Sequence, residues 1–258
     1  MKNVYLVFKK ELRSYFLSPI AYVIITIFLI LGGYFFYNIF ASFSMVSFEA
    51  TQNPVLAKQY NLLNVTESVV RPLFGNMSII MLLMMPMLTM RLLSEEKKSG
   101  TIELLLTYPV KDIEIILGKF FAAVVIFSVM IALTFPCFIL LSVLGQPEWG
   151  VIISGYIGLL LMGTAFIAFG LCASSFTENQ IIAAAVSFGG LLVFYMMGYS
   201  VNFAGPKLGG VLSYISFMPH LYNFAKGVVD TEDIIFYLNF AVFCLFLTMR
   251  TLESKRWR

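Results

Sequence analysis

Residues that could carry out chemistry are few in this sequence, and they form no recognisable catalytic pattern. His220 is the sole histidine, and no serine or cysteine nucleophile motif lies near it. Cys137, Cys172 and Cys244 lack the CxxC spacing of zinc sites and redox pairs. We therefore expect no catalytic residue and no metal site, and we interpret His220 and the cysteines as structural.

A built-in energy source is also missing from the sequence. There is no GxxxxGK[ST] phosphate loop, so we do not expect the chain to bind ATP and magnesium in that manner. Ion-coupled transporters place Asp, Glu, His or Lys side chains inside the membrane, and the six apolar windows described below contain none. Active transport would therefore be powered by another protein, and we expect no cofactor bound by this chain.

A charged segment, residues 91–119, interrupts the otherwise apolar sequence. Ser99 is a candidate N-cap and Glu103 suits a first helical turn, which together predict a short helix from 101 to 108. This helix would end before Pro109, because the residue ahead of a proline is pushed out of the helical region. We expect Asp112 to cap the helix that follows.

The predicted short helix would expose more apolar surface than a free loop usually does. It fits the groove of a partner protein, and it fits equally the lipid headgroups or the neighbouring spans, so the residues alone do not decide. The candidate partner-binding residues, of which the first four are expected to form a solvated rim, are Glu95, Glu96, Lys97, Lys98, Ser99, Gly100, Thr101, Ile102, Glu103, Leu104, Leu105, Leu106, Thr107, Tyr108 and Pro109.

The elements that carry these residues are expected to be membrane spans. Hydrophobic residues make up 60% of the 258 residues and charged ones 12%, against about half and about a quarter in soluble domains. A helix needs about 20 apolar residues to cross the hydrocarbon layer, and charge-free windows of about that size occur at 20–40, 73–90, 120–144, 151–173, 181–203 and 234–249. The windows are apolar on every face, unlike barrel strands. We predict one all-α, polytopic membrane domain over residues 1–258.

The last two parts of this pattern need comment. The window 234–249 spans only about 24 Å by helical rise, so we expect it to borrow residues before Asp230 or to lie where the bilayer thins. Glycines are frequent in the windows 151–173 and 181–203. They predict close helix packing, either within the chain or at a dimer seam.

Lysine and arginine mark the expected orientation, since cytoplasmic loops retain them. All but four of the 17 Lys and Arg residues lie at the chain ends or in residues 91–119. The exceptions are Lys58, Arg71, Lys207 and Lys226. With six spans, both termini and the charged segment are expected on the cytoplasmic side. The net charge of +3 follows from this topology, and we expect no nucleic-acid partner.

Two regions outside the windows have helical patterns of their own. Residues 1–18 carry apolar side chains on one face and basic ones on the other, which predicts a helix at the membrane interface in contact with lipid; a charged flank of the first span is the alternative. Residues 205–230 are apolar but broken by glycine and by Pro219, which predicts two short re-entrant helices. The interfacial residues of interest are Phe8, Lys9, Lys10, Glu11, Arg13 and Tyr15.

Two runs of the sequence resemble a known family. The run SEEKKSGTIELLLTYPVKDIEIILGKF, residues 94–120, resembles ABC-2 type permeases of ATP-binding-cassette (ABC) transporters. The run ISFMPHLYNFAKGVVDTEDIIFYL, residues 215–238, resembles the branch that contains gliding-motility-associated permeases. The likeness extends over essentially the whole chain.

This resemblance implies a multi-pass permease subunit in the cytoplasmic (inner) membrane of a prokaryote. It implies a homodimer that docks two ABC ATPase subunits, which hold the ATP and magnesium. Residues 94–112 would be the coupling loop, with 101–108 as the coupling helix, and the interfacial helix would also touch the ATPase. The re-entrant helices, with Pro219 and His220, would match an outer gate. An auxiliary subunit with an extracytoplasmic domain often accompanies such permeases.

Other functions stay open at the level of sequence. A force-transmitting or assembly subunit of an envelope machine would move no solute, and ATP-dependent movement of lipid, peptide or glycan in vesicles separates it from an exporter. An intramembrane enzyme would need a nucleophile and a base in a hydrated cavity, which His220 alone does not supply. No regular aromatic ladder marks a sugar route among the 26 phenylalanines, so the sequence names no substrate.

Overall fold

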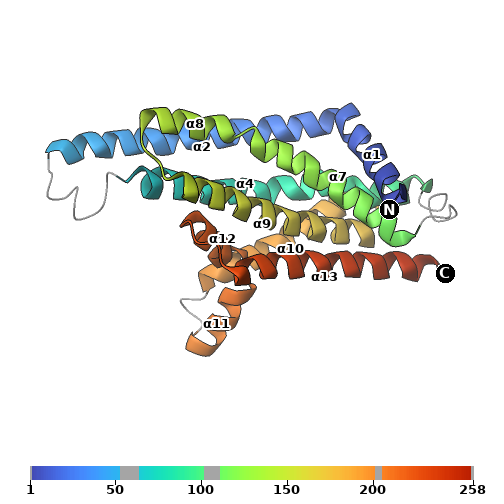
Figure 1. Cartoon of the computed structure of the whole chain (residues 1–258). Helices are drawn as coiled ribbons and strands as arrows, with labels where there is room; N and C mark the ends of the chain where they lie inside the picture. The colour runs from blue at the N-terminus through green and yellow to red at the C-terminus, as the bar shows by residue number, and fades with distance from the viewer. Residues whose placement is uncertain (1, 53–63, 102–110, 201–204, 257–258) are drawn as a thin grey trace.

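The chain folds as a bundle of long helices. The structure, a computed structural model, describes residues 2–52, 64–101, 111–200 and 205–256, which are helical apart from short connections. Within these ranges six helical stretches are long and apolar enough to cross a membrane. The prediction of an all-α, polytopic membrane protein is therefore confirmed. The long helices run side by side, and both chain ends lie at the same end of the bundle (Figure 1).

Six candidate spans and three further helices make up the described fold. The spans are built from α2 (Pro19–Gln52); the π-helix η1 (Thr66–Val70) with α4 (Arg71–Thr89) and α5 (Arg91–Lys98); α7 (Asp112–Ala132) with α8 (Phe135–Leu144); α9 (Trp149–Phe176); α10 (Gln180–Ser200); and α13 (Thr231–Arg256). The further helices are α1 (Lys2–Leu17), α11 (Gly205–Ile215) and α12 (Phe217–Ala225).

Several helices extend beyond the expected windows. α2 continues to Gln52, twelve residues past the expected end at residue 40, and α7 begins at Asp112. The expectation of a short last span is wrong, because α13 has 26 residues and begins at Thr231, after Asp230. Its first turn contains Asp233, and acidic residues are favourable at a helix N-terminus. The window appeared short because this acidic residue was treated as the end of the helix.

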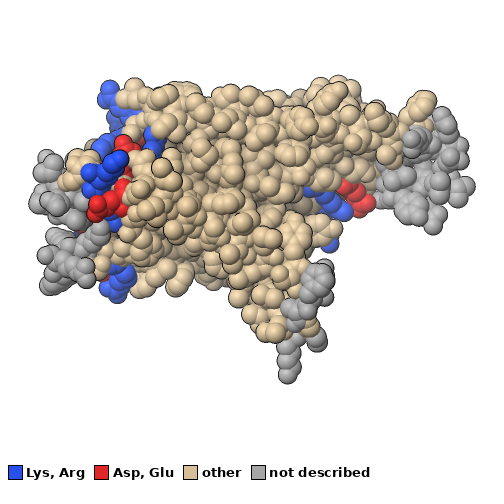
Figure 2. Space-filling view, turned by 180° about the vertical axis from the view of Figure 1, so that it is seen from behind, with Lys and Arg blue, Asp and Glu red and all other residues tan. Residues whose placement is uncertain are grey.

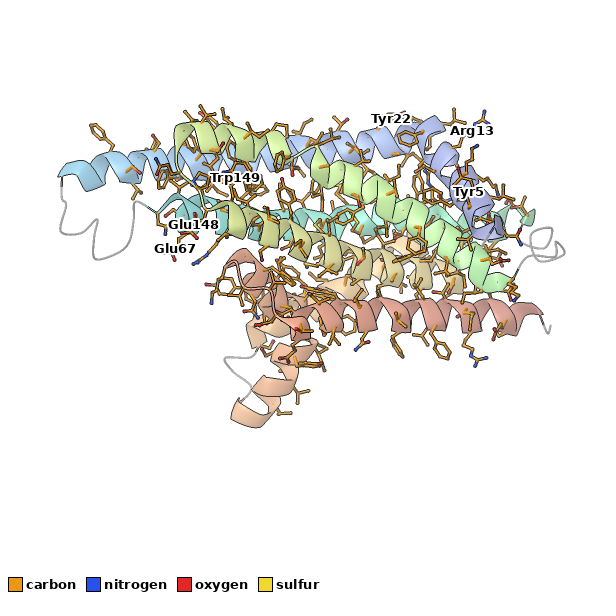
Figure 3. All side chains as sticks on the ribbon, viewed as in Figure 1. Tyr5, Arg13, Tyr22, Glu67, Glu148 and Trp149 are labelled. Carbon is orange, nitrogen blue, oxygen red and sulfur yellow. The ribbon has the colours of Figure 1, made fainter. Side chains whose placement is uncertain are left out.

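The helices outside the spans lie at two places. α1 crosses the end of the bundle that holds the chain termini, and α11 projects from the side of the bundle near the start of α13 (Figure 1). The two short helices expected between residues 205 and 230 are present as α11 and α12. Exposed aromatic residues stand at both ends of the spans, Tyr22 at one and Trp149 at the other (Figure 3). Such residues are typical of membrane–water interfaces.

α9 is the central helix of the fold. It contacts α4, α5, α7, α10, α12 and α13, and most of its side chains are buried. Its small residues let neighbouring rings approach its backbone, as lipid-embedded helices require. A Cβ added to Gly163 would lie 2.1 Å from two ring atoms of Phe127 in α7. Packing within the chain therefore accounts for this glycine, whereas a Cβ on Gly189 of α10 would meet nothing within 4 Å.

Replacing Gly163 with Ala should destabilise the bundle. The added methyl group must displace the buried Phe127 ring, and overpacking of this kind costs about 1–3 kcal/mol. Gly189→Ala is the matched control, because the same methyl group meets open space within the chain. Thermal unfolding of the two variants in detergent measures the difference. Equal midpoints for Gly163→Ala and the unaltered protein would contradict the close packing of α9 on α7.

Candidate functional site

Charged side chains gather at one end of the molecule. Figure 2 shows a dense group of Lys, Arg, Asp and Glu at one end of the bundle and a smaller group toward the other. The dense group belongs to the end that holds both chain termini, and Figure 3 places Tyr5 and Arg13 of α1 there. We call this the charged end; it is built from α1, α5, the start of α7 and the last turn of α9.

Lys119 of α7 is the centre of a buried ionic cluster. Its Nζ lies 2.9 Å from Oε1 of Glu11 in α1 and 2.9 Å from Oε1 of Glu96 in α5. The Lys119 side chain is only 2% exposed, and the two carboxylate side chains are 12% and 13% exposed. Lys10 approaches Glu96 at 3.6 Å from an exposed position. One ammonium group thus ties three helices together, in surroundings where little water screens the attraction.

α1 packs closely on α7 beside this cluster. A Cβ added to Gly118 would lie 2.7 Å from Cγ1 of Val7 and 3.1 Å from the backbone nitrogen of Phe8. Nδ2 of Asn3 donates a hydrogen bond to Oε2 of Glu114, at 3.1 Å. The N-terminal helix is therefore fixed along one side to the third candidate span, by shape and by polar contacts.

Tyr15 and Arg91 connect the α1–α2 junction to the α4–α5 junction. The Tyr15 hydroxyl donates to the backbone oxygen of Leu88 at 3.1 Å, and Arg91 donates to Oγ of Ser18 at 2.7 Å. The Arg91 guanidinium lies 4.8 Å from the centre of the Tyr15 ring, a cation–π contact. Burial raises the pKa of Tyr15, so its hydroxyl stays neutral and donates. Tyr15 therefore faces the protein, and not the membrane as the face pattern of α1 predicts.

A single hydroxyl of α9 holds the start of α5. Oγ of Ser174 donates to the backbone oxygen of Met90 and accepts from the N–H groups of Leu93 and Ser94, each at 3.0 Å. The first N–H groups of a helix have no partner within that helix, and Ser174 satisfies two of them. The turn between α4 and α5 is thus fixed by a side chain about 80 residues away in the sequence.

Lys97 fixes the other end of α5. It is 7% exposed, and its Nζ donates to the backbone oxygen of Ser175, in the last turn of α9. A positive charge is favourable there, because the last carbonyl groups of a helix are unpaired and carry partial negative charge. The expected solvated rim is therefore wrong for Glu96 and Lys97, while Glu95 and Lys98 are exposed as expected.

The caps of the neighbouring helices differ from expectation. Ser99 is the C-cap of α5 and donates to the backbone oxygen of Glu95 at 2.9 Å, instead of starting the next helix. Gly100 follows with φ of +69°, the left-handed conformation that commonly ends a helix. At the start of α7, the N–H of Lys111 donates to Oε2 of Glu114, so Glu114 provides the cap expected from Asp112. The predicted coupling helix lies, apart from Thr101, in residues 102–110, outside the described residues.

A polar cavity of about 240 Å³ lies between α1, α5 and α7. Glu11, Glu96, Lys119, Arg91 and Thr101 are among the residues that line it. Oε2 of Glu96 is buried and has no hydrogen-bond partner among the described residues. In the part of the chain that the structure describes, no group of three His, Cys, Asp or Glu side chains could hold a metal ion. The site can bind and position charged groups, and its residues suggest no reaction.

The chain matches one known protein family over nearly its whole length. A family model described as ABC-2 family transporter protein matches residues 5–253, from the first turn of α1 to the last turns of α13. The chain belongs to the ABC-2 family. No curated protein matches it. ABC-2 proteins are the membrane-spanning part of ABC transporters and lack an ATPase domain, so family membership implies an ATPase partner.

The opposite end of this ABC-2 chain holds the second expected site. Pro219 lies in the first turn of α12, and His220 is buried, with Nδ1 2.5 Å from Oδ1 of Asp233 in α13. His220 was expected from the sequence and Asp233 was not, because an acidic residue beside a span is ordinarily the boundary of that span. Ser174 was not expected either, although two adjacent serines at the end of an apolar span were a signal for a polar contact.

Replacing Lys119 with Met should unfold the charged end of the ABC-2 chain. The change removes the only counterion that the described residues give the buried Glu11 carboxylate and leaves Glu96 paired only with the exposed Lys10, at 3.6 Å, and such a loss costs about 3–5 kcal/mol. Lys10→Met is the control, because Lys10 is exposed and its pairing with Glu96 contributes less than about 1 kcal/mol. Thermal unfolding and limited proteolysis within α1 report the effect. Equal stability of the two variants would show that the cluster does not hold α1 in place.

Proposed function

We propose that this chain is the permease subunit of an ABC exporter, in which a separate ATPase subunit drives movement through the coupling loop, residues 94–112. The observation that carries the proposal is the fixation of α5. This helix leads directly into residues 102–110 and is joined to α9 at both of its ends, by Ser174 and by Lys97. A push on the segment that follows α5 would therefore reach the central helix of the fold.

The ionic cluster supplies a second route. Glu96 of α5 joins α7 through Lys119, and Lys119 joins α1 through Glu11. Residues 95–98 thus have two roles. Glu96 and Lys97 hold α5 in place, and the exposed Glu95 and Lys98 are accessible to a partner. We infer that the ATPase contacts α1 and residues 95–109 together, since α1 meets Glu95, Glu96, Ser99 and Thr101 at one cavity.

The remaining parts of the proposal follow the family. Two copies assemble as a homodimer, and α10 leaves most of its surface uncovered for a second copy or for lipid. Both termini and the charged end face the cytoplasm of a prokaryote, which places Lys and Arg according to the positive-inside rule. α1, which crosses the end of the bundle (Figure 1), would lie at the membrane interface and beside the docked ATPase.

We also propose that α11 and α12 form the outer gate. They stand toward the end opposite the termini, and α12 contacts the central helix α9 directly. The run 215–238, which resembles gliding-motility-associated permeases, comprises α12 and the start of α13. An auxiliary subunit with an extracytoplasmic domain would bind at this end of the bundle, as that resemblance implies.

Replacing Leu105 with Asp should abolish docking of the ATPase. A charge placed in an apolar groove costs at least about 2 kcal/mol, or about thirtyfold in Kd. Leu105→Met keeps an apolar side chain of similar size and is the control. Co-purification of the ATPase with each variant measures the loss. Full complex formation and full ATPase stimulation by Leu105→Asp would remove the coupling segment from the proposal.

Replacing Ser174 with Ala should separate binding from transmission. The ATPase should still bind, but its stimulation by the permease should fall about fivefold or more, because two buried N–H groups of α5 lose their partner at about 1–3 kcal/mol. Ser142→Ala is the control, since Ser142 bonds only within its own helix. ATP hydrolysis by the reconstituted complex is the measurement. Normal stimulation by Ser174→Ala would show that α5 does not act through α9.

A further inference from the structure

The sole histidine of the chain joins three helices. Nδ1 of His220 in α12 lies 2.5 Å from Oδ1 of Asp233 in α13, and Nε2 lies 2.9 Å from the backbone oxygen of Tyr214 in α11. Nδ2 of Asn223 donates to the second oxygen of Asp233 at 3.0 Å. His220 is 5% exposed and Asp233 is 2% exposed. Water therefore does not compete for these contacts.

Both nitrogens of the His220 ring face oxygen atoms, and this determines how many protons the site holds. A neutral imidazole has one N–H donor and one acceptor nitrogen. If Asp233 is ionised and the ring is neutral, one lone pair points at either the carboxylate or the Tyr214 carbonyl. Two protons satisfy both contacts: either both lie on the ring, or one lies on Asp233 and the other on Nε2. The two contacts are therefore best satisfied by one proton more than a neutral histidine and a carboxylate hold.

The surroundings favour a charged ring. The His220 ring stacks on the face of Phe236 with centres 4.1 Å apart and planes at 19°, and a cation over an aromatic face is attracted to it. A charge-assisted bond to Asp233 is also stronger than a neutral one. The Tyr237 ring centre lies 6.1 Å from that of His220. Its hydroxyl donates to the backbone oxygen of Phe217 at 2.9 Å and not to the imidazole.

Asp233 is the acidic group in contact with the ring among the described residues. The other titratable side chains on elements around α12 make no hydrogen bond to it there. They are Arg71 on α4; Tyr156 and Cys172 on α9; Tyr195 and Tyr199 on α10; Tyr214 on α11, whose ring lies edge-on to the imidazole; Tyr222 and Lys226 on α12; and Glu232, Tyr237, Cys244, Arg250 and Glu253 on α13.

We propose that His220 and Asp233 form a proton-binding site that fastens α11 and α12 to α13. With the extra proton bound, the His220 ring makes a satisfied hydrogen bond to α11 and another to α13. When that proton leaves, one of the two hydrogen bonds of His220 is lost, and a nitrogen lone pair then faces an oxygen atom. The attachment of α11 and α12 to α13 is therefore present at lower pH and is lost as the pH rises. The pH on that side of the membrane would then set how readily the outer gate opens, a step that rests on the proposed function; the proton site itself does not.

The protonation state can be read directly, because one histidine gives one set of imidazole signals. The full chain, purified with a tag free of histidine and labelled with ¹⁵N-histidine, is placed in lipid nanodiscs for NMR. At neutral pH we expect both ring nitrogens to carry protons, or one on Nε2 with Asp233 protonated as seen by ¹³C labelling of its carboxyl. Asp233→Asn should leave a neutral ring, and Glu232→Gln, an exposed neighbour, should change nothing. A neutral ring beside an ionised Asp233 in the unaltered protein overturns the proposal, even if Asp233→Asn fails to fold.

Hydrogen exchange tests the fastening. The exchange rate of the amides in residues 208–225 is corrected for the intrinsic pH dependence of amide exchange and compared with that of α9. The corrected rate should rise about tenfold from mildly acidic to mildly alkaline pH, because one buried hydrogen bond is lost. Asp233→Asn should show the higher rate throughout. If the exchange rate of residues 208–225 relative to α9 does not change with pH in the unaltered protein, the proposed pH-dependent attachment of α11 and α12 to α13 is wrong. ATPase stimulation by the same samples tests the proposed function separately, since the NMR and exchange results do not depend on a partner.

Discussion

Close approach of neighbouring helices to α9 is the constraint on which the rest of the structure depends. Lipid tails are as apolar as leucine, so the hydrophobic effect does not drive spans together inside a membrane, and dense packing must do so. Rings from other helices fill the spaces beside its glycines, Phe127 against Gly163 and Phe224 against Gly158. The positions of α7 and α12 follow from these contacts. The charged end and the histidine site are therefore placed by one helix that carries no charge of its own.

Several hydroxyl groups inside the spans are satisfied within their own helices, and the buried ion pairs of the described residues lie toward the two ends of the bundle. Thr248 and Ser128 donate to carbonyl groups one turn earlier in their own helices, which removes the cost of a free hydroxyl in hydrocarbon. At the ends, Lys119 and Asp233 are buried only because they have partners from other helices. These pairs fix which helices meet, a task that apolar packing alone leaves less specific.

The sequence predicts the spans well because a missing charge is a local property that can be counted along the chain. It predicts the charged end poorly because burial there depends on distant residues. Lys97 was expected in water, yet it meets a carbonyl group 78 residues away, at the end of α9. Asp233 was expected outside a span, yet a histidine from the preceding helix makes its place in α13 favourable. Helix caps failed for a related reason, since Ser99 fits the end of one helix as well as the start of another.

The lack of any break in α9 distinguishes it from two of its neighbours, α4 and α7. α4 contains Pro86 and gives way to α5 at Met90, and α7 gives way to α8 at Leu133 and Thr134. α9 runs for 28 residues, about 42 Å. Ser174 in its last turn bonds to α5, and at its other end the N–H of the N-cap residue Glu148 donates to Oγ1 of Thr66 at 3.0 Å. Such a helix behaves as a stiff rod. A displacement applied at one end of α9 would therefore reach its other end with little loss. The broken helices α4 and α7 would bend at their breaks to accommodate it.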